Sequence, residues 1–144
     1  YQLTELKLQQ VRISNIVDLP LIEGLFSLEL VQMPIVDLNG LKDKYPELIR
    51  LNITNTAVDD LRPLEGLTSL EVLNFSGTNV KRFKGLEGLM NLKEIDCSNT
   101  KVFKFDRLGD LKNLKKITCF NTGLRQNDID KLIEIIPDLE VIFY

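Results

Sequence analysis

The chain has 144 residues, 44% of which are hydrophobic, and a formal net charge of −3 at pH 7. This composition is ordinary for one globular domain, and the slight acidity disfavours a nucleic-acid partner, because proteins that bind nucleic acids are usually basic. The sequence has no histidine and only two cysteines, which excludes His-based catalytic triads, His-ligated metal sites and a disulfide-rich scaffold.

A hydrophobic pattern recurs about every 22 residues from the start of the chain to its end. Residues 70–80 and 92–102, for example, follow the same order of apolar and polar positions. A fixed period of this length predicts one supersecondary unit stacked on copies of itself, and therefore a single repeat domain over residues 1–144. Six units and a truncated seventh each begin at a leucine: Leu3, Leu25, Leu48, Leu70, Leu92, Leu114 and Leu139.

Each unit is expected to begin with a strand. Its fourth and sixth positions are apolar, the period of two that predicts a strand with one buried face. The unit then carries leucines three apart, as in residues 61–70, which predicts a tight helical or 3-10 turn returning along the far side. Stacked units would form a parallel sheet on one side. The fourth positions are Leu6, Leu28, Leu51, Leu73, Ile95, Ile117 and Ile142; the sixth positions are Leu8, Leu30, Ile53, Phe75, Cys97, Cys119 and Tyr144.

Residues 63–73, with the sequence Pro-Leu-Glu-Gly-Leu-Thr-Ser-Leu-Glu-Val-Leu, resemble the leucine-rich repeat, in particular its short, internalin-like bacterial class. The resemblance covers nearly the whole chain, since all six units match. It implies an α/β fold, a right-handed solenoid with the parallel β-sheet on its concave face and short 3-10 or helical turns on its convex face. It also implies a non-catalytic role in holding another macromolecule.

The ninth position departs from this family, whose typical residue there is asparagine. A threonine hydroxyl can satisfy the backbone groups where the strand turns away, with less reach than an amide. The apolar residues of the first two units cannot, so we expect those two units to be less regular. The ninth residues in order are Val11, Met33, Thr56, Thr78, Thr100 and Thr122.

The two ends of the repeat array differ. Residues 124–144 are predicted to form a C-terminal cap, in which an amphipathic helix with Asn127 or Asp128 as N-cap precedes a last strand over residues 139–143. The N-terminal end has no comparable cap, so the leucines of the first strand would face water. We expect a missing segment, a neighbouring domain or a partner to cover them, and the chain to be part of a larger chain or assembly. The apolar positions of the cap helix are Ile129, Leu132, Ile133 and Ile136.

The sequence offers little for catalysis or cofactor binding. Cys97 and Cys119 share the inward sixth position in adjacent units, where we expect buried free thiols, although their separation does not exclude a disulfide. Asp59 and Asp60 are the only adjacent carboxylates, and we expect them in a solvated turn. No set of ligands has the spacing of a metal site, and no glycine-rich phosphate loop occurs. We therefore predict no enzyme, no metal and no cofactor.

Basic residues concentrate in one part of the chain. Residues 81–116 hold ten Lys and Arg against five acids, whereas residues 1–80 hold six against eleven. Arg82 and Lys104 share one repeat position, and the lysines at 81, 84 and 101 are close in the repeat. The pattern fits either a basic ridge on the loop edge or an ordinary solvated, lysine-rich face.

Two functions fit the repeat. The first is recognition of a protein partner, with a glycan as the alternative ligand, through the fifth, seventh and eighth positions that project from the concave sheet. Phe120 and Phe143 are expected to be neighbouring aromatic anchors there, unless the cap helix folds over them. The second is a structural or assembly scaffold that docks another domain or subunit through the open N-terminal edge. The candidate partner-binding residues are Asn52, Asn74, Ser76, Asp96, Ser98, Asn99, Lys116, Thr118, Phe120 and Phe143.

The sequence leaves the cellular compartment open, because a bacterial cell surface, secretion and the cytoplasm all fit it. No run of about 18 apolar residues occurs, so we expect no membrane-spanning helix.

Overall fold

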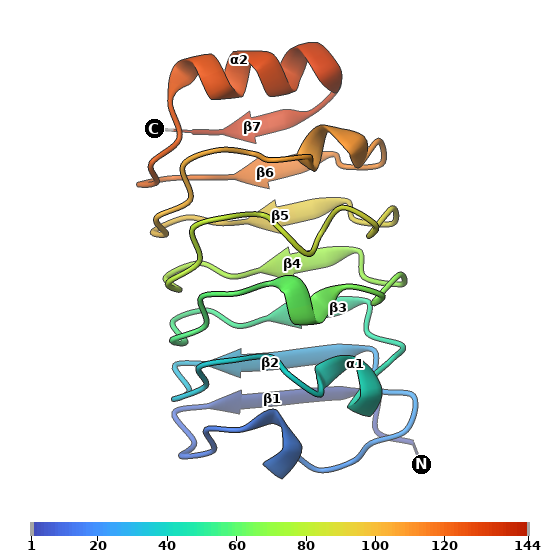
Figure 1. The fold of residues 1–144 in the computed structure, drawn as a ribbon. Helices are drawn as coiled ribbons and strands as arrows, with labels where there is room; N and C mark the ends of the chain where they lie inside the picture. The colour runs from blue at the N-terminus through green and yellow to red at the C-terminus, as the bar shows by residue number, and fades with distance from the viewer. Residues whose placement is uncertain (1, 144) are drawn as a thin grey trace.

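The structure, a computed structural model, describes residues 2–143 and consists of coils stacked along one axis (Figure 1). Each coil contributes one strand, and every strand pairs in parallel with the next strand along the chain, so the order in the sheet equals the order in the sequence. The chain coils in a right-handed sense as it rises from the first strand to the last (Figure 1). The strands are β1 (Glu5–Gln9), β2 (Ser27–Val31), β3 (Arg50–Asn52), β4 (Val72–Asn74), β5 (Glu94–Asp96), β6 (Lys116–Thr118) and β7 (Glu140–Ile142).

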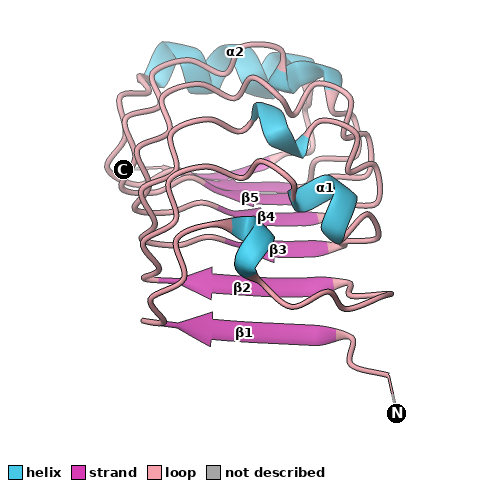
Figure 2. Ribbon diagram, turned by 60° about the horizontal axis from the view of Figure 1, so that its bottom comes forward, coloured by secondary structure: helices cyan, strands magenta, loops and turns pink. Residues whose placement is uncertain are grey.

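The return segments lie on the side opposite the sheet, as Figure 2 shows. Most carry a single short helical turn, in keeping with the predicted leucine spacing of three. The parallel sheet thus forms the concave face of the solenoid, and the short helices lie on its convex face. The helical segments are the 3-10 turns η1 (Ile16–Asp18), η2 (Arg62–Leu64) and η3 (Leu108–Asp110), with the α-helices α1 (Leu41–Lys44) and α2 (Gln126–Ile135).

The interior consists of rows of equivalent side chains, one from each unit. Leu28, Leu51 and Leu73 lie side by side in register across β2, β3 and β4 and are at most 1% exposed. The row continues through Ile95 and Ile117. Each row member fills the space between two neighbouring units. One apolar residue in each unit therefore gives one continuous row of the core.

Threonines at the ninth position satisfy backbone carbonyls, as predicted. The Thr78 hydroxyl donates to the Phe75 carbonyl at 2.7 Å, and the Thr56 hydroxyl donates to the Ile53 carbonyl at 2.9 Å. Thr100 makes the same bond to Cys97. In each case the acceptor lies three residues earlier, in the same unit, so the bond closes the turn that follows the strand.

The first two units are not the less regular ones, and that prediction is wrong for their strands. β1 and β2 pair over five residues, whereas β3, β4 and β5 span three residues each. For β3, β4 and β5 the reason lies at the fifth position. Where it is asparagine or aspartate, its side-chain oxygen accepts the N–H of the seventh residue, which is then lost to the sheet. Lys7 and Glu29 take this place in the first two units and make no such turn, so the strands continue.

The cap helix begins earlier in the sequence than predicted. α2 starts at Gln126 with Arg125 as its N-cap, and neither Asn127 nor Asp128 has that place. Asp128 instead occupies the third helical position, and its carboxylate accepts the Arg125 N–H at 2.9 Å. Ile129, Leu132 and Ile136 are buried, as the spacing predicts, whereas Ile133 is 37% exposed.

The register of the last strand differs from the prediction by one residue. Val141 pairs with Ile117, and Ile142 pairs with Thr118. Leu139 has the place of a first-position leucine, since its N–H bonds to the carbonyl three residues earlier as in Leu114. In the sixth unit, Lys115 stands between Leu114 and Lys116. Glu140 follows Leu139 directly and pairs with Lys116, so the seventh unit lacks a residue equivalent to Lys115. The predicted sixth-position Tyr144 lies outside the described residues.

The N-terminal end of the stack exposes a strand edge and an apolar side chain. On its outer side β1 has no partner strand among residues 2–143, and Leu3 is 54% exposed.

No helix within residues 2–143 is long and apolar enough to cross a bilayer.

Candidate binding surface

The concave face presents one row of side chains for each outward position of the strands. Two hollows lie along it. One of about 380 Å³ extends over β1 to β4 and is lined by Lys7, Arg50 and Asn52 among others. The other, of about 210 Å³, lies over β4 to β6 and includes Asp96 and Lys116. The face is therefore a broad, gently hollowed surface to which every unit contributes.

The fifth-position side chains present only part of their polar groups to this surface. Asn74 Oδ1 accepts the Ser76 N–H at 3.0 Å and the Thr54 hydroxyl at 3.1 Å. Asn52 Oδ1 accepts the Thr54 N–H at 3.0 Å. Because the oxygens are engaged in the fold, the amide nitrogens of Asn52 and Asn74 are the polar groups that these turns do not use. Both asparagines thus accept hydrogen bonds at the strand ends and also lie on the concave surface.

Asp96 follows the same geometry, with one carboxylate oxygen accepting the Ser98 N–H at 3.0 Å. Its second oxygen is available beside the half-buried Lys116, which forms no ion pair with any residue from 2 to 143. Thr118 lines the same hollow. This part of the face therefore offers both signs of charge within one hollow.

Ser98 does not belong to the exposed surface, which corrects its place among the candidate residues. It is only 4% exposed, and its Oγ accepts the Phe120 N–H at 3.1 Å. Ser76 is half-buried and donates its hydroxyl to the Ser98 carbonyl. The seventh-position serines thus link neighbouring units, and Ser98 supports Phe120 instead of meeting a partner itself.

Phe143 is also misplaced by the sequence prediction. Because the seventh unit is one residue short, Phe143 takes the inward sixth position and packs against the core. The residue that faces outward opposite Thr118 is Ile142, which is not among the predicted partner-binding residues. Phe120 and Ile142 are diagonal neighbours across β6 and β7. Both are half-buried, so an apolar corner exists, but with isoleucine in place of the second ring.

Asn99 lies at the rim, where the strand has already turned. It has a positive φ of 57°, and its Oδ1 accepts the Asn121 amide at 3.1 Å. The eighth residues of all six full units share this left-handed conformation, which asparagine and glycine adopt most easily. They are Gln10, Gln32, Asn55, Gly77, Asn99 and Asn121.

Two ion pairs link neighbouring units near the sheet. Lys7 lies 3.6 Å from Glu29, and Lys93 lies 3.3 Å from Glu71. All four side chains are exposed or nearly so, and such pairs contribute at most about 1 kcal/mol. Each of these two pairs places one positive and one negative side chain on adjacent units of the surface.

The two cysteines lie inside and are free thiols, as predicted. Burial, with smaller contributions from Cys119 and Asp96, raises the pKa of the Cys97 thiol well above its usual value. Burial and the Asp96 carboxylate raise the pKa of Cys119 to about 11. Both thiols are therefore protonated at neutral pH and are poor nucleophiles. Across residues 2–143, no three His, Cys, Asp or Glu side chains are grouped so that they could hold a metal ion.

No family model and no curated protein matches the sequence. Several solved structures do resemble it. An internalin C2 from Listeria monocytogenes has a TM-score of 0.73 and 19% identity over 99% of this chain, which covers 71% of that protein's chain. A leucine-rich-repeat protein from Leptospira interrogans has a TM-score of 0.84 and 20% identity over 98% of this chain.

TLR13, in a complex with ssRNA13, has a TM-score of 0.75 and 20% identity over 95% of this chain. The chain spans 37% of the Leptospira protein and 21% of TLR13, so these similarities concern one part of larger molecules. At such identities they establish the fold. The predicted fold is confirmed: the chain is a right-handed leucine-rich-repeat solenoid.

Proposed function

We propose that the concave face is a non-catalytic recognition surface for a protein partner. The observation that carries this proposal is the apolar corner formed by Phe120 and Ile142, beside polar groups that the fold leaves available. Aromatic side chains beside a polar rim are typical anchors of protein interfaces. The amide nitrogens of Asn52 and Asn74, together with Lys116, supply hydrogen bonds and charge along the same face.

The resemblance to solved structures supports the general class of this function. The similar proteins include TLR13, whose structure holds an ssRNA13, so a solenoid of this fold can carry a ligand. A protein ligand fits this chain better than a nucleic acid, because its net charge is −3 and carboxylates accompany basic side chains near the sheet, as in the Lys7–Glu29 and Lys93–Glu71 pairs.

The repeat itself supplies a matched test. Phe120→Ser introduces the residue that Ser76 and Ser98 place at the same position, and Ile142→Thr copies the neighbouring Thr118. Both changes use side chains that this fold already accepts. Val31→Thr is the control, since it gives the second unit the Thr54 side chain at the same repeat position but far from the corner.

Candidate partners are captured on immobilised wild-type protein, purified, and titrated against the three proteins. We expect the double variant to bind at least about tenfold more weakly, as for loss of interface anchors, while Val31→Thr retains affinity. Melting curves check that all three are folded. Equal binding by the double variant and the wild type would refute the proposal, and loss of binding after deglycosylation of the partner would identify a glycan as the ligand.

A second candidate is assembly through the N-terminal edge. Its supporting observation is that β1 has an unpaired outer side and an exposed Leu3 within the described chain. Hydrogen exchange of the complex separates the two functions. Protection of the residues along β3 to β6 supports recognition by the concave face, whereas protection confined to residues 1–30 supports docking at the edge.

A further inference from the structure

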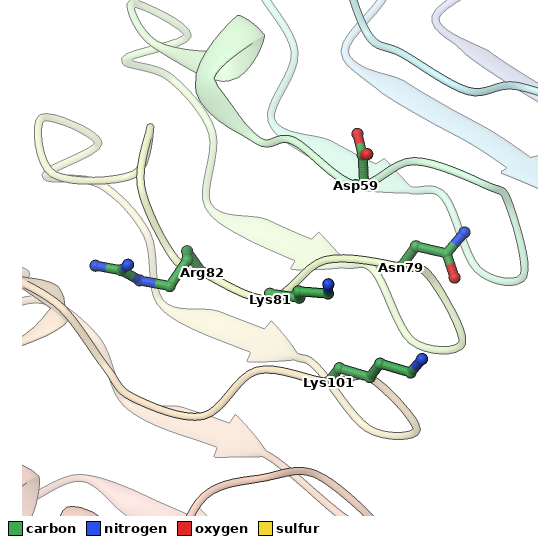
Figure 3. A pocket seen from close by; sticks show the side chains of 5 residues that line it. All are labelled: Asp59, Asn79, Lys81, Arg82 and Lys101. Atoms are coloured by element: carbon green, nitrogen blue, oxygen red, sulfur yellow. The ribbon is translucent and has the colours of Figure 1, made fainter.

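A second surface lies on the loops that follow the carboxyl ends of the strands. Lys81 and Lys101, from the loops after β4 and β5, line a hollow of about 310 Å³ together with Asn79, Asp59 and Arg82. Figure 3 shows the two lysine side chains extending in the same direction, on the side of Asn79, while Arg82 extends the opposite way. Asp59 comes from the preceding loop and is turned away from both ammonium groups (Figure 3).

The lysines here have no ion-pair partner in the described part of the chain, whereas the arginine does. The Asp106 carboxylate accepts hydrogen bonds from both Nε and Nη2 of the Arg82 guanidinium. Lys81, Lys101 and Lys104, which we call the lysine ridge, form no ion pair with any residue of 2–143. On the sheet, by comparison, Lys7 and Lys93 each pair with a glutamate of an adjacent unit. Like charges on adjacent coils repel one another, and an anion bound between them would relieve that repulsion.

An aromatic ring lies beside the ridge. Phe103 is 48% exposed. The Arg82 guanidinium lies 5.6 Å from its ring centre, and the Lys104 ammonium lies 5.8 Å from it. These cation–π contacts hold the ring in place on the surface. The ridge thus combines a fixed apolar group with free ammonium groups.

We propose that the lysine ridge binds an acidic segment of a protein, with carboxylates between Lys81 and Lys101 and an apolar side chain against Phe103. A peptide fits better than a nucleic acid, because Asp59 lines the hollow and Arg82, which also lines it, is paired with the Asp106 carboxylate. A continuous phosphate backbone would approach these carboxylates, whereas a peptide can place its own carboxylates only where the lysines are. This surface is separate from the concave face, so it stands whether or not the concave face binds a partner.

The probe is a short fluorescein-labelled peptide of alternating glutamate and leucine, titrated by fluorescence anisotropy at low salt. Lys81→Gln with Lys101→Gln removes two charges from the hollow. The control, Lys42→Gln with Lys112→Gln, removes the same charge from two exposed lysines elsewhere. We expect the first double variant to bind about tenfold more weakly, and the control to change affinity less than about twofold. Phe103→Ala should weaken binding about threefold.

A second readout concerns the protein without peptide. Because the ridge lysines repel one another, the Lys81→Gln/Lys101→Gln variant should melt at a higher temperature than the wild type. Equal weakening by both double variants would overturn the proposal, since it would show a general effect of net charge. A single-stranded oligonucleotide of similar length that binds the ridge more tightly than the peptide would overturn the peptide assignment in favour of nucleic acid.

Discussion

Single hydroxyl groups hold the turns of this solenoid. Thr78 is 4% exposed, and its hydroxyl meets the Phe75 carbonyl where that carbonyl has no strand partner. Thr122 takes the same place in the sixth unit, but its hydroxyl lies 3.5 Å from the Cys119 carbonyl and its side chain is only half-buried. The chain therefore offers a strong and a weak version of one interaction.

Replacing Thr78 by the nearly isosteric valine should lower the free energy of unfolding by about 1–3 kcal/mol, because a buried carbonyl loses its donor. Thr122→Val, the control, should lower it by less. Urea denaturation monitored by circular dichroism measures both. An unchanged Thr78→Val protein would show that the hydroxyl does not stabilise the turn.

Asp106 binds two loops together. Its carboxylate accepts the Arg82 guanidinium at 3.0 Å and the Phe83 N–H at 3.0 Å, and its side chain is 8% exposed. Burial alone would raise the pKa of this carboxyl, but the bonds from Arg82 and Phe83 outweigh it, and the pKa of Asp106 lies below its ordinary value. Folding therefore favours the ionised form.

Asp106→Asn should lower the free energy of unfolding at neutral pH by about 1–3 kcal/mol, the range for hydrogen bonds to a charged group. A lowered pKa means that this contribution is complete above the ordinary value and is lost as the pH falls through the folded value, so the difference from wild type should shrink below about pH 4. Asp110→Asn is the control, since its pair with Arg107 is exposed. A difference that stays constant from neutral to acid pH would contradict the ionic role of Asp106.

At the scale of the strand, the inner rows determine stability. Leu73 is fully buried between Leu51 and Ile95 in the adjacent strands. Leu73→Ala would empty a slot that two units share, so it should cost about 2–5 kcal/mol. Chemical denaturation measures the loss, and Val72→Ala on the outer face of the same strand is the control. A loss near zero would mean that the row is not packed as described.

The elements that repeat could be predicted from the sequence, because each inner row applies the same packing rule again. The short length of β3, β4 and β5 could also have been predicted, since the signal is local: an asparagine or aspartate at the fifth position binds the N–H two residues later. Lys7 and Glu29 lack this option.

The ends of elements at the cap were harder to predict. The place of Phe143 depends on a single residue missing after Leu139, and hydrophobic spacing alone fits either register when both Val141 and Ile142 are apolar. The helix start was missed because its bond comes from the Asp128 side chain at the third helical position. The burial of Ser98 depends on the neighbouring unit, whose backbone N–H it accepts at Phe120.

At the scale of the whole molecule, each unit touches only the units before and after it. Stability is then close to a sum of unit and interface contributions, and the two end units have the fewest partners. Charge is organised at this scale as well. Lys7 and Lys93 near the sheet pair with glutamates of adjacent units, whereas the lysine ridge has no ion pair within residues 2–143, so binding at the ridge should depend more strongly on salt.

Cys97 and Cys119 can report how the solenoid opens. They occupy the same inward position in consecutive units, and Cys119 lies nearer the cap. A small alkylating reagent reaches either sulfur only when its coil separates from the stack, so each alkylation rate reports an opening event of one unit. Simultaneous labelling of both thiols means that the solenoid opens as a whole, whereas Cys119 before Cys97 means that it unwinds from the cap inward.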